Sequence, residues 1–283
     1  MNYIKSYKLF ESKEIVMAGV QNALDNNNLE LFKDLVNQHG DLIDYDFIFN
    51  QISHTNSYWF SIKRNKHFPF LKYFPSHCFD NISRIDFSDG NLYELDVTMF
   101  HDLKILNCSS NKLFELDVSN NPKLVQLNCD NNLLTNLDVS MLPNLDILNC
   151  YNNQLKTLSI SSTVLKRLNC SNNLLTNLDV SLLTNLTHLE CGHNKITNLD
   201  LASTHLKLVW CGSNQITSLD VSESKYLFEL YCHDNKLTNL NVKGCTSIDR
   251  ICCYGNKLTN LDIRGLVKLT DCVYDKEKTN LIK

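Results

Sequence analysis

The chain has 283 residues, of which 20% are charged, and its formal net charge is −4. This length allows one large or two modest domains, and the weak net charge excludes an overall field strong enough to recruit nucleic acid or an anionic membrane surface. No apolar run approaches the about 18 residues that span a bilayer, and charges interrupt the opening MNYIKSYKLFESKE where a signal peptide needs apolar residues, so we expect a cytoplasmic protein with no membrane partner.

Residues 1–80 lack the regular repeat that follows them, and their pattern predicts a helical N-terminal cap. Apolar residues at helical spacing predict helices over 13–25 and 29–38, with a turn at Asn26–Asn28 between them. The stretch 20–40 resembles the helix pair of an ankyrin repeat, although it lacks the T-P-L-H signature of that family. A cap is required at this end because a stack of repeats exposes its core there.

Basic residues alternate with aromatic residues over 58–74, which reads YWFSIKRNKHFPFLKYF. Such a pattern is compatible with bases stacking on the aromatic rings. An aromatic stripe that joins a helical cap to an apolar solenoid end is the commoner arrangement, and acidic residues elsewhere in the cap offset the charge. We therefore interpret this segment as part of the cap and do not expect nucleic acid as the partner.

Eight cysteines recur at steps of 20 or 21 residues, at Cys108, Cys129, Cys150, Cys170, Cys191, Cys211, Cys232 and Cys253. Around each of them the sequence approximates L-x-x-L-x-C-x-x-N-x-L-T-x-L-D-V-S, a period that indicates stacked coils. The motif resembles the leucine-rich repeat family in its leucines, its small apolar cysteine column and its asparagine three positions later, over about residues 82–275. The resemblance implies a leucine-rich-repeat solenoid over 81–275, with a curved parallel β-sheet on the concave face and little regular helix on the convex side. Residues 276–283 are then expected to form a polar C-terminal tail.

The columns of the repeat each have a physical interpretation. Alternation in L-x-C predicts that Leu168 and Cys170 point inward while Asn169 points outward. The cysteines are expected to fill the core, because an in-register column keeps its sulfurs at strand spacing and pointing the same way, which suits neither disulfides nor zinc. The asparagines are expected to satisfy backbone donors and acceptors where the chain turns out of the strand.

Aspartates form another column, at Asp96, Asp117, Asp138, Asp179, Asp200, Asp220 and Asp262. We expect each carboxylate to cap a turn together with the following hydroxyl residue, as in Asp179-Val180-Ser181. The alternative is calcium bound between coils, as in β-roll repeats, but the glycine-rich nonapeptide of those repeats is absent. The sequence therefore predicts neither a metal site nor a cofactor.

The leucine-rich repeat resemblance implies that partners bind the concave strand face, and the outward columns there gain aromatic and charged residues toward the C-terminal half. The predicted partner-binding residues are Arg167, His188, Glu190, Trp210, Glu229, Tyr231, His233, Arg250 and Tyr254. Aromatic residues with arginine are typical of binding hot spots. The alternative is that the rings only cover the sheet, with Trp210 in contact with Tyr231 across neighbouring strands. Cys252 is predicted to face outward as the one reactive thiol candidate of a regular coil.

These observations favour a non-enzymatic scaffold for protein–protein interaction that binds a partner through the C-terminal half of the concave face. The alternative is a small or nucleotide-like ligand on the same face, with rings stacking on it and Arg250 meeting an anion. No catalytic residue is predicted, because no nucleophile–base pair, phosphate loop or metal motif occurs. The opening KSYKLFES resembles the starts of proteins from tailed phages, which would imply a factor that captures or inhibits a host protein.

Overall fold

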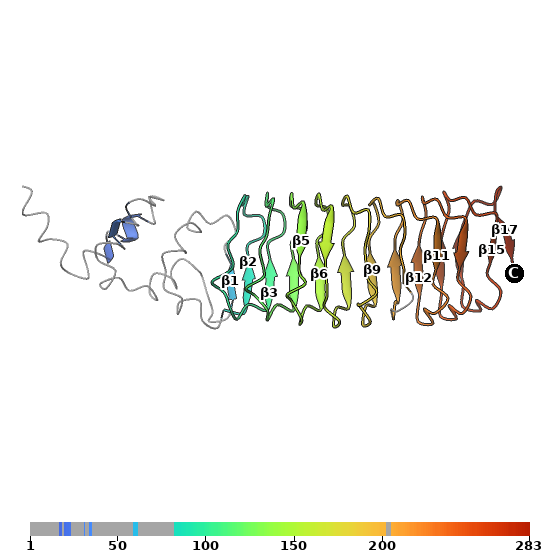
Figure 1. The fold of residues 1–283 in the computed structure, drawn as a ribbon, viewed down its shortest axis with the longest axis horizontal. Helices are drawn as coiled ribbons and strands as arrows, with labels where there is room; N and C mark the ends of the chain where they lie inside the picture. Colours follow the sequence, from blue (N-terminus) through green and yellow to red (C-terminus); the bar gives the residue numbers. More distant parts are fainter. Residues whose placement is uncertain are drawn as a thin grey trace, which may run out of the picture.

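The structure is a computed structural model that describes residues 17–18, 20–23, 31, 34–35, 59–61, 82–201 and 205–283 (Figure 1). Of the two helices predicted over 13–25 and 29–38, the described positions are helical, and Val20, Ala23 and Leu35 are buried. The rest of the predicted cap, including most of the basic and aromatic segment 58–74, lies outside the described residues. The helical cap therefore stays a prediction.

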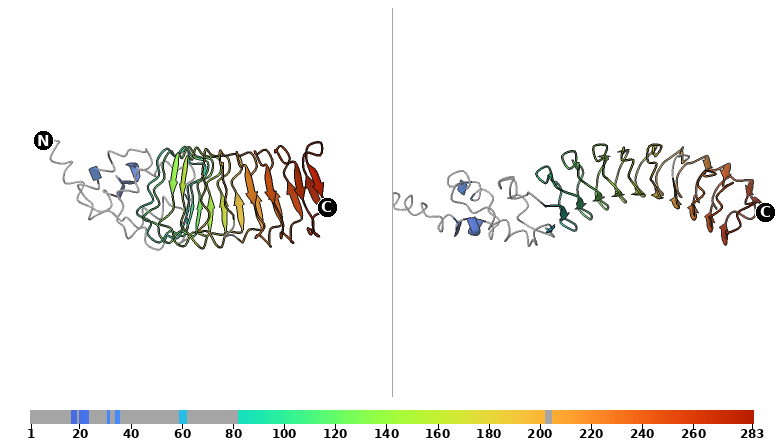
Figure 2. Two further views of the ribbon diagram at one scale, coloured as in Figure 1. Left: turned by 45° about the vertical axis from the view of Figure 1, so that its right-hand side comes forward. Right: turned by 90° about the horizontal axis from the view of Figure 1, so that it is seen from below.

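One 11-stranded sheet runs the length of the described solenoid, and all its strands are parallel and in register. Its strands, in spatial order, are β1 (Trp59–Ser61), β2 (Arg84–Asp86), β3 (Ile105–Asn107), β4 (Gln126–Asn128), β6 (Ile147–Asn149), β8 (Arg167–Asn169), β9 (His188–Glu190), β10 (Leu208–Trp210), β12 (Glu229–Tyr231), β14 (Arg250–Cys252) and β16 (Asp271–Val273). The coils follow a curved path with this sheet on the inner side of the bend (Figure 2). The predicted parallel-sheet solenoid is confirmed.

The L-D part of the repeat forms a second, interrupted row of strands. These are β5 (Asn136–Asp138) with β7 (Thr157–Ser159), β11 (Ser218–Asp220) with β13 (Asn239–Asn241), and β15 (Asn260–Asp262) with β17 (Asn280–Ile282). Within 82–201 and 205–283 the remaining chain consists of turns and irregular structure without helix. This agrees with the expectation of little regular helix outside the concave sheet.

Both ends of the solenoid extend beyond the regular repeat. β1 pairs with β2 although the 21-residue pattern does not reach residues 59–61. At the other end, residues 276–283 were expected to be a polar tail, yet they contain β17, and its neighbour Thr279 is buried. The reason is that Thr279-Asn280-Leu281 repeats the T-x-L portion of the motif, so these residues complete the last coil.

The core is built from the leucine and cysteine columns, as Leu168 (1% exposed) and Cys170 (0% exposed) illustrate, while Asn169 faces outward and is half-buried. The eight column cysteines are free, buried thiols. Burial is the main cause that raises the pKa of Cys170 to about 12, so this thiol is uncharged and unreactive at neutral pH. The predicted role of the cysteines as core packing is confirmed.

The asparagine column ties each coil to the one before it. Asn173 Nδ2 donates to the carbonyl oxygens of Cys150 and Cys170, both at 3.0 Å, and Asn173 Oδ1 accepts from the backbone N–H of Leu155 at 2.9 Å. The same three kinds of bond recur at Asn111, Asn132, Asn153, Asn194, Asn214, Asn235 and Asn256. A carboxamide suits this position because it donates and accepts at once, as predicted.

Candidate functional site

Strand register places seven of the nine predicted partner-binding residues in two rows that cross β8, β9, β10, β12 and β14 on the concave face, and His233 and Tyr254 lie in a third row just beyond the strand ends. The first row contains Arg167, His188, Leu208, Glu229 and Arg250. The second row contains Asn169, Glu190, Trp210, Tyr231 and Cys252. The third row lies just beyond the strand ends, two positions after the second row, and contains Ser171, Gly192, Gly212, His233 and Tyr254. The charged side chains therefore lie in the first and second rows, and the tryptophan and tyrosine rings lie in the second and third.

Four ring-bearing residues form what we call the aromatic patch, namely Trp210, Tyr231, His233 and Tyr254. The Trp210 and Tyr231 rings are 5.9 Å apart between centroids and inclined at 44°, which is the contact across neighbouring strands that the alternative interpretation, rings covering the sheet, expected. The His233 and Tyr254 rings are stacked, with centroids 5.1 Å apart and an interplanar angle of 20°. Trp210 and Tyr254 remain 40% and 39% exposed, so the patch offers ring surface to solvent.

Two glycines allow the rings to fold down onto the sheet. A Cβ atom built on Gly192 would lie 3.1 Å from Nε1 of Trp210, and one on Gly212 would lie 2.6 Å from Cε1 of His233. Any larger residue at Gly212 would therefore displace the imidazole. Sequence reasoning assigned no role to these glycines; the available signal is that Gly212 precedes the bulky His233 by one coil in the third row, with Gly192 one coil before it.

A network of hydrogen bonds fixes Tyr231 and Arg250 relative to each other. The Tyr231 hydroxyl donates to Glu229 Oε2 at 3.0 Å, and Arg250 Nη1 donates to the Tyr231 oxygen at 3.3 Å. Arg250 Nε also pairs with Asp271 Oδ2 at 3.1 Å. The hydrogen bond that Arg250 donates to Tyr231 is the first cause that raises the pKa of Arg250. Asp271 was missed from sequence, although it occupies the position one coil after Arg250 in the same row.

On β9, toward the N-terminal side of these rows, Glu190 and His188 are partly desolvated. Glu190 is half-buried, Asn169 Nδ2 donates to its Oε2 at 3.0 Å, and desolvation raises the pKa of its carboxyl. The pKa of His188 is lowered, first by desolvation and then by the charges of Arg167 and Lys207, which favours the neutral imidazole at pH 7. In the described part of the chain, no group of three or more His, Cys, Asp or Glu side chains is arranged to hold a metal ion.

Cys252 faces outward at the end of the second row, as predicted, but it is only partly exposed. Its pKa is raised, first by desolvation and then by the charges of Asp271 and Asp234. Because the thiolate is the nucleophile, these neighbours lower the reactivity of Cys252 rather than enhance it.

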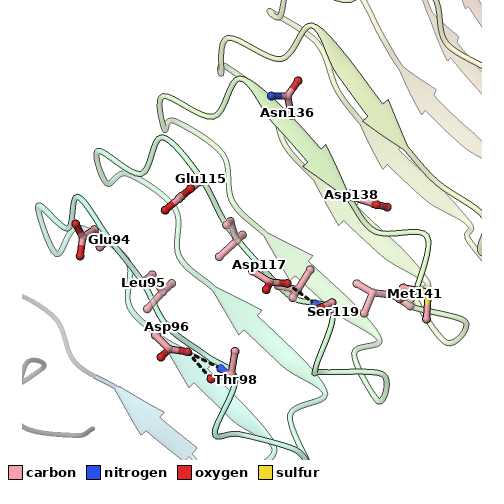
Figure 3. Close-up of a pocket in the computed structure, with 13 residues that line it drawn as sticks. Glu94, Leu95, Asp96, Thr98, Glu115, Asp117, Ser119, Asn136, Asp138 and Met141 are labelled. Atoms are coloured by element: carbon pink, nitrogen blue, oxygen red, sulfur yellow. Dashed lines mark hydrogen bonds between the residues drawn. The ribbon is translucent and has the colours of Figure 1, made fainter.

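A cavity of about 600 Å³ lies away from the three concave rows. Figure 3 shows Glu94 and Glu115 in one row of its lining and Asp96, Asp117 and Asp138 in another. The aspartates are engaged locally: Asp117 Oδ1 accepts from the Ser119 N–H at 2.9 Å, and this bond is the first cause that lowers the pKa of Asp117. The predicted turn-capping role with a following hydroxyl residue is confirmed at Asp96, Asp117, Asp138, Asp179 and Asp220. Asp262 also caps its turn, but with the N–H of Arg264 in place of a hydroxyl residue.

Stacked coils, a continuous parallel concave sheet, and in-register leucine, cysteine and asparagine columns define a leucine-rich repeat architecture. The chain is a leucine-rich repeat protein, and the solved structures that resemble it agree. It is similar to the functional domain of InlJ from Listeria monocytogenes, described as including a cysteine ladder, with 36% identity and a TM-score of 0.68 over 71% of this chain and 45% of that one. The chain thus spans less than half of the InlJ chain.

Two further solved structures share the fold at lower identity. YopM from Yersinia enterocolitica is 24% identical with a TM-score of 0.59, covering 69% of this chain and 46% of that chain. A leucine-rich repeat protein of Leptospira interrogans is 23% identical with a TM-score of 0.56, covering 73% of this chain and 64% of that chain. No protein-family model and no curated protein matches the chain. None of the helical residues described belongs to a helix long and apolar enough to cross a membrane.

Proposed function

We propose that the chain is a non-enzymatic scaffold that binds another protein through the C-terminal half of its concave face. The observation that supports this most directly is the aromatic patch, whose Trp210 and Tyr254 rings stay about 40% exposed on a sheet that holds them in place. Aromatic residues with few torsions lose little conformational entropy on binding, so they are enriched at the centre of protein interfaces.

A protein partner is favoured over a small or nucleotide-like ligand by the state of Arg250. That ligand would need the guanidinium to meet an anion, but Arg250 already bonds Tyr231 and Asp271. The cavities of about 600, 510 and 540 Å³ are lined by residues outside the three concave rows. A broad open face suits a protein footprint of about 800 Å² per partner.

The fold has a precedent for this use. The plant peptide hormone receptor RGFR1, solved in complex with RGF2, has a TM-score of 0.53 to this chain at 18% identity. That likeness concerns the fold alone. A cytoplasmic location and the capture of a host protein by a phage-encoded factor stay predictions from the sequence.

The test is affinity capture from a lysate of the native host, with wild type compared with the double variant Trp210→Ala/Tyr231→Ala. A matched control is Phe114→Ala/Tyr226→Ala, because both of those rings are exposed (49% and 63%) and lie outside the three concave rows. Thermal melting establishes that every variant is folded. We expect one protein to be retained by wild type and by the control and lost from the Trp210/Tyr231 variant.

Equal retention by all three proteins would contradict the proposal, since the patch would then contribute nothing to binding. Loss from both double variants would show that the capture depends on exposed aromatic surface in general rather than on this face.

A further inference from the structure

We propose that Glu190 and Trp210 together form a site that receives a lysine or arginine side chain from an extended peptide segment of the protein partner. This inference rests on the proposed function and deepens it, because it names the chemistry that the concave face recognises. The two residues are neighbours in register on β9 and β10, about 4.8 Å apart in backbone spacing.

Glu190 is a carboxylate without a cation of its own. It is half-buried, and its one hydrogen bond within the described residues comes from the neutral amide of Asn169. No lysine, arginine or histidine in the described part of the chain forms an ion pair with it. A partly buried charge is stabilised by pairing with an opposite charge, and the raised pKa of the carboxyl, caused by desolvation, is consistent with that pairing being unmet in the free protein.

Trp210 supplies the second half of the site. Its indole leans over Gly192, two positions after Glu190, so the ring lies over the coil that carries Glu190, just beyond the end of β9. Trp210 is 40% exposed, and a cation over an exposed tryptophan face is attracted by the negative face of the ring. The Nε1 and Cδ1 edge of the indole lies against Gly192, and no residue in the described part of the chain accepts a hydrogen bond from its N–H.

The cations of the same face are placed elsewhere. Arg250 is bonded to Tyr231 and Asp271, on the far side of Trp210 from Glu190. Arg167 is exposed in the first row, in register with His188 rather than with Glu190. Charge complementarity at Glu190 therefore falls to a group that the partner supplies.

The test uses four acetylated, amidated pentapeptides in which a central lysine, arginine, norleucine or glutamate is flanked by glycines. Each is titrated into the full 15N-labelled chain, and the indole N–H signal of Trp210, assigned with Trp210→Phe, is followed. We expect the lysine and arginine peptides to shift this signal saturably in the millimolar range. The norleucine and glutamate peptides should bind at least tenfold more weakly.

Glu190→Gln is the decisive variant because it keeps shape and removes charge, and Glu115→Gln on the opposite face is its control. Glu190→Gln should weaken the lysine and arginine peptides at least tenfold, and Glu115→Gln should change nothing. Equal responses to lysine and norleucine, or an unaffected Glu190→Gln, would overturn the inference. If lysate capture is lost with Trp210→Ala/Tyr231→Ala but kept by Glu190→Gln, the proposed binding face stands and this site falls.

Discussion

At the residue scale, the asparagine column is where a small change should cost most. Asn173 satisfies two carbonyls and one backbone N–H between coils, in a position that is 5% exposed. Asn173→Ala leaves three backbone groups without these partners, at about 1–3 kcal/mol for each that water cannot reach. We expect the free energy of unfolding to fall by about 2–4 kcal/mol in chemical denaturation.

The control for that variant is Asn177→Ala, which removes an exposed asparagine only four residues away. Its effect should stay within about 0.5 kcal/mol. Similar losses for both variants would mean that asparagine acts through general polarity and not through the bonds between coils.

Glu190 gives a second prediction at the residue scale. The negative charge that would bind a cation from the partner should destabilise the free protein. Desolvation raises the pKa of its carboxyl above the unfolded value, so the folded state holds the proton more tightly. The ionised group therefore lowers stability as pH rises through that raised pKa, and the deficit is full at pH 7. Glu190→Gln should stabilise the free protein at pH 7, by about 0.5 kcal/mol or less given its partial exposure, and have no such effect near pH 3.

Thermal melting of wild type and Glu190→Gln at both pH values measures this difference. A variant that melts lower than wild type at pH 7 would show that the carboxylate has a stabilising partner in the free protein, which would also weaken the case for a cation from outside.

At the element scale, the last strand, β17, contributes more to stability than its polar sequence suggests. β17 pairs with β15, and the buried Thr279 hydroxyl donates to the Leu258 carbonyl at 2.8 Å. Removing residues 276–283 exposes the edge of β15. It also removes Leu281, which packs against the core. We expect this truncation to lower the melting temperature by several degrees, since a loss of about 1 kcal/mol corresponds to about 2–4 °C in a chain of this size.

Removal of Lys283 alone is the matched control, because that residue follows β17 and is exposed. An unchanged melting temperature after the longer truncation would mean that β17 contributes no stability to the last coil.

The two terminal strands also show what sequence reasoning could and could not find. Regular coils were predictable because each column obeys one local rule: leucine and cysteine inward, asparagine at the turn, aspartate at the cap. β17 preserves only Thr279-Asn280-Leu281 of that motif after the charged run DKEK, and β1 preserves none of it at the 21-residue period. Pairing at a sheet edge depends on backbone groups, which side-chain columns do not report.

The candidate site was likewise only partly predictable from the sequence. The rows of outward residues follow from strand alternation, so seven of the nine predicted residues share one face by register, and His233 and Tyr254 follow just beyond the strands. The ring packing on Gly192 and Gly212 and the ion pair of Arg250 with Asp271 depend on side-chain rotamers, which periodicity does not encode.

At the scale of the whole molecule, the aspartate caps couple stability to acid. Hydrogen bonds from residues two positions later lower the pKa values of Asp117, Asp138, Asp179 and Asp220, and bonds from Arg264 lower that of Asp262 to about 2. A carboxyl with a lowered folded pKa stabilises the fold fully above its unfolded pKa, near 4, and loses that contribution as pH falls through the folded value. Each capping carboxylate adds a small stabilising contribution, and these contributions sum over many coils. The free energy of unfolding should therefore fall steeply between about pH 4 and 2.

Asparagine provides a matched replacement, because Asn241 caps the same turn in its own coil by accepting from the Lys243 N–H at 3.2 Å. The triple variant Asp117→Asn/Asp138→Asn/Asp179→Asn keeps the caps but removes three titrating groups. Denaturant unfolding at pH 7, 4 and 2 should show a variant slightly less stable than wild type at pH 7 and a smaller loss between pH 4 and 2. Parallel curves for the two proteins would contradict this account, because acid would then act through groups other than the caps.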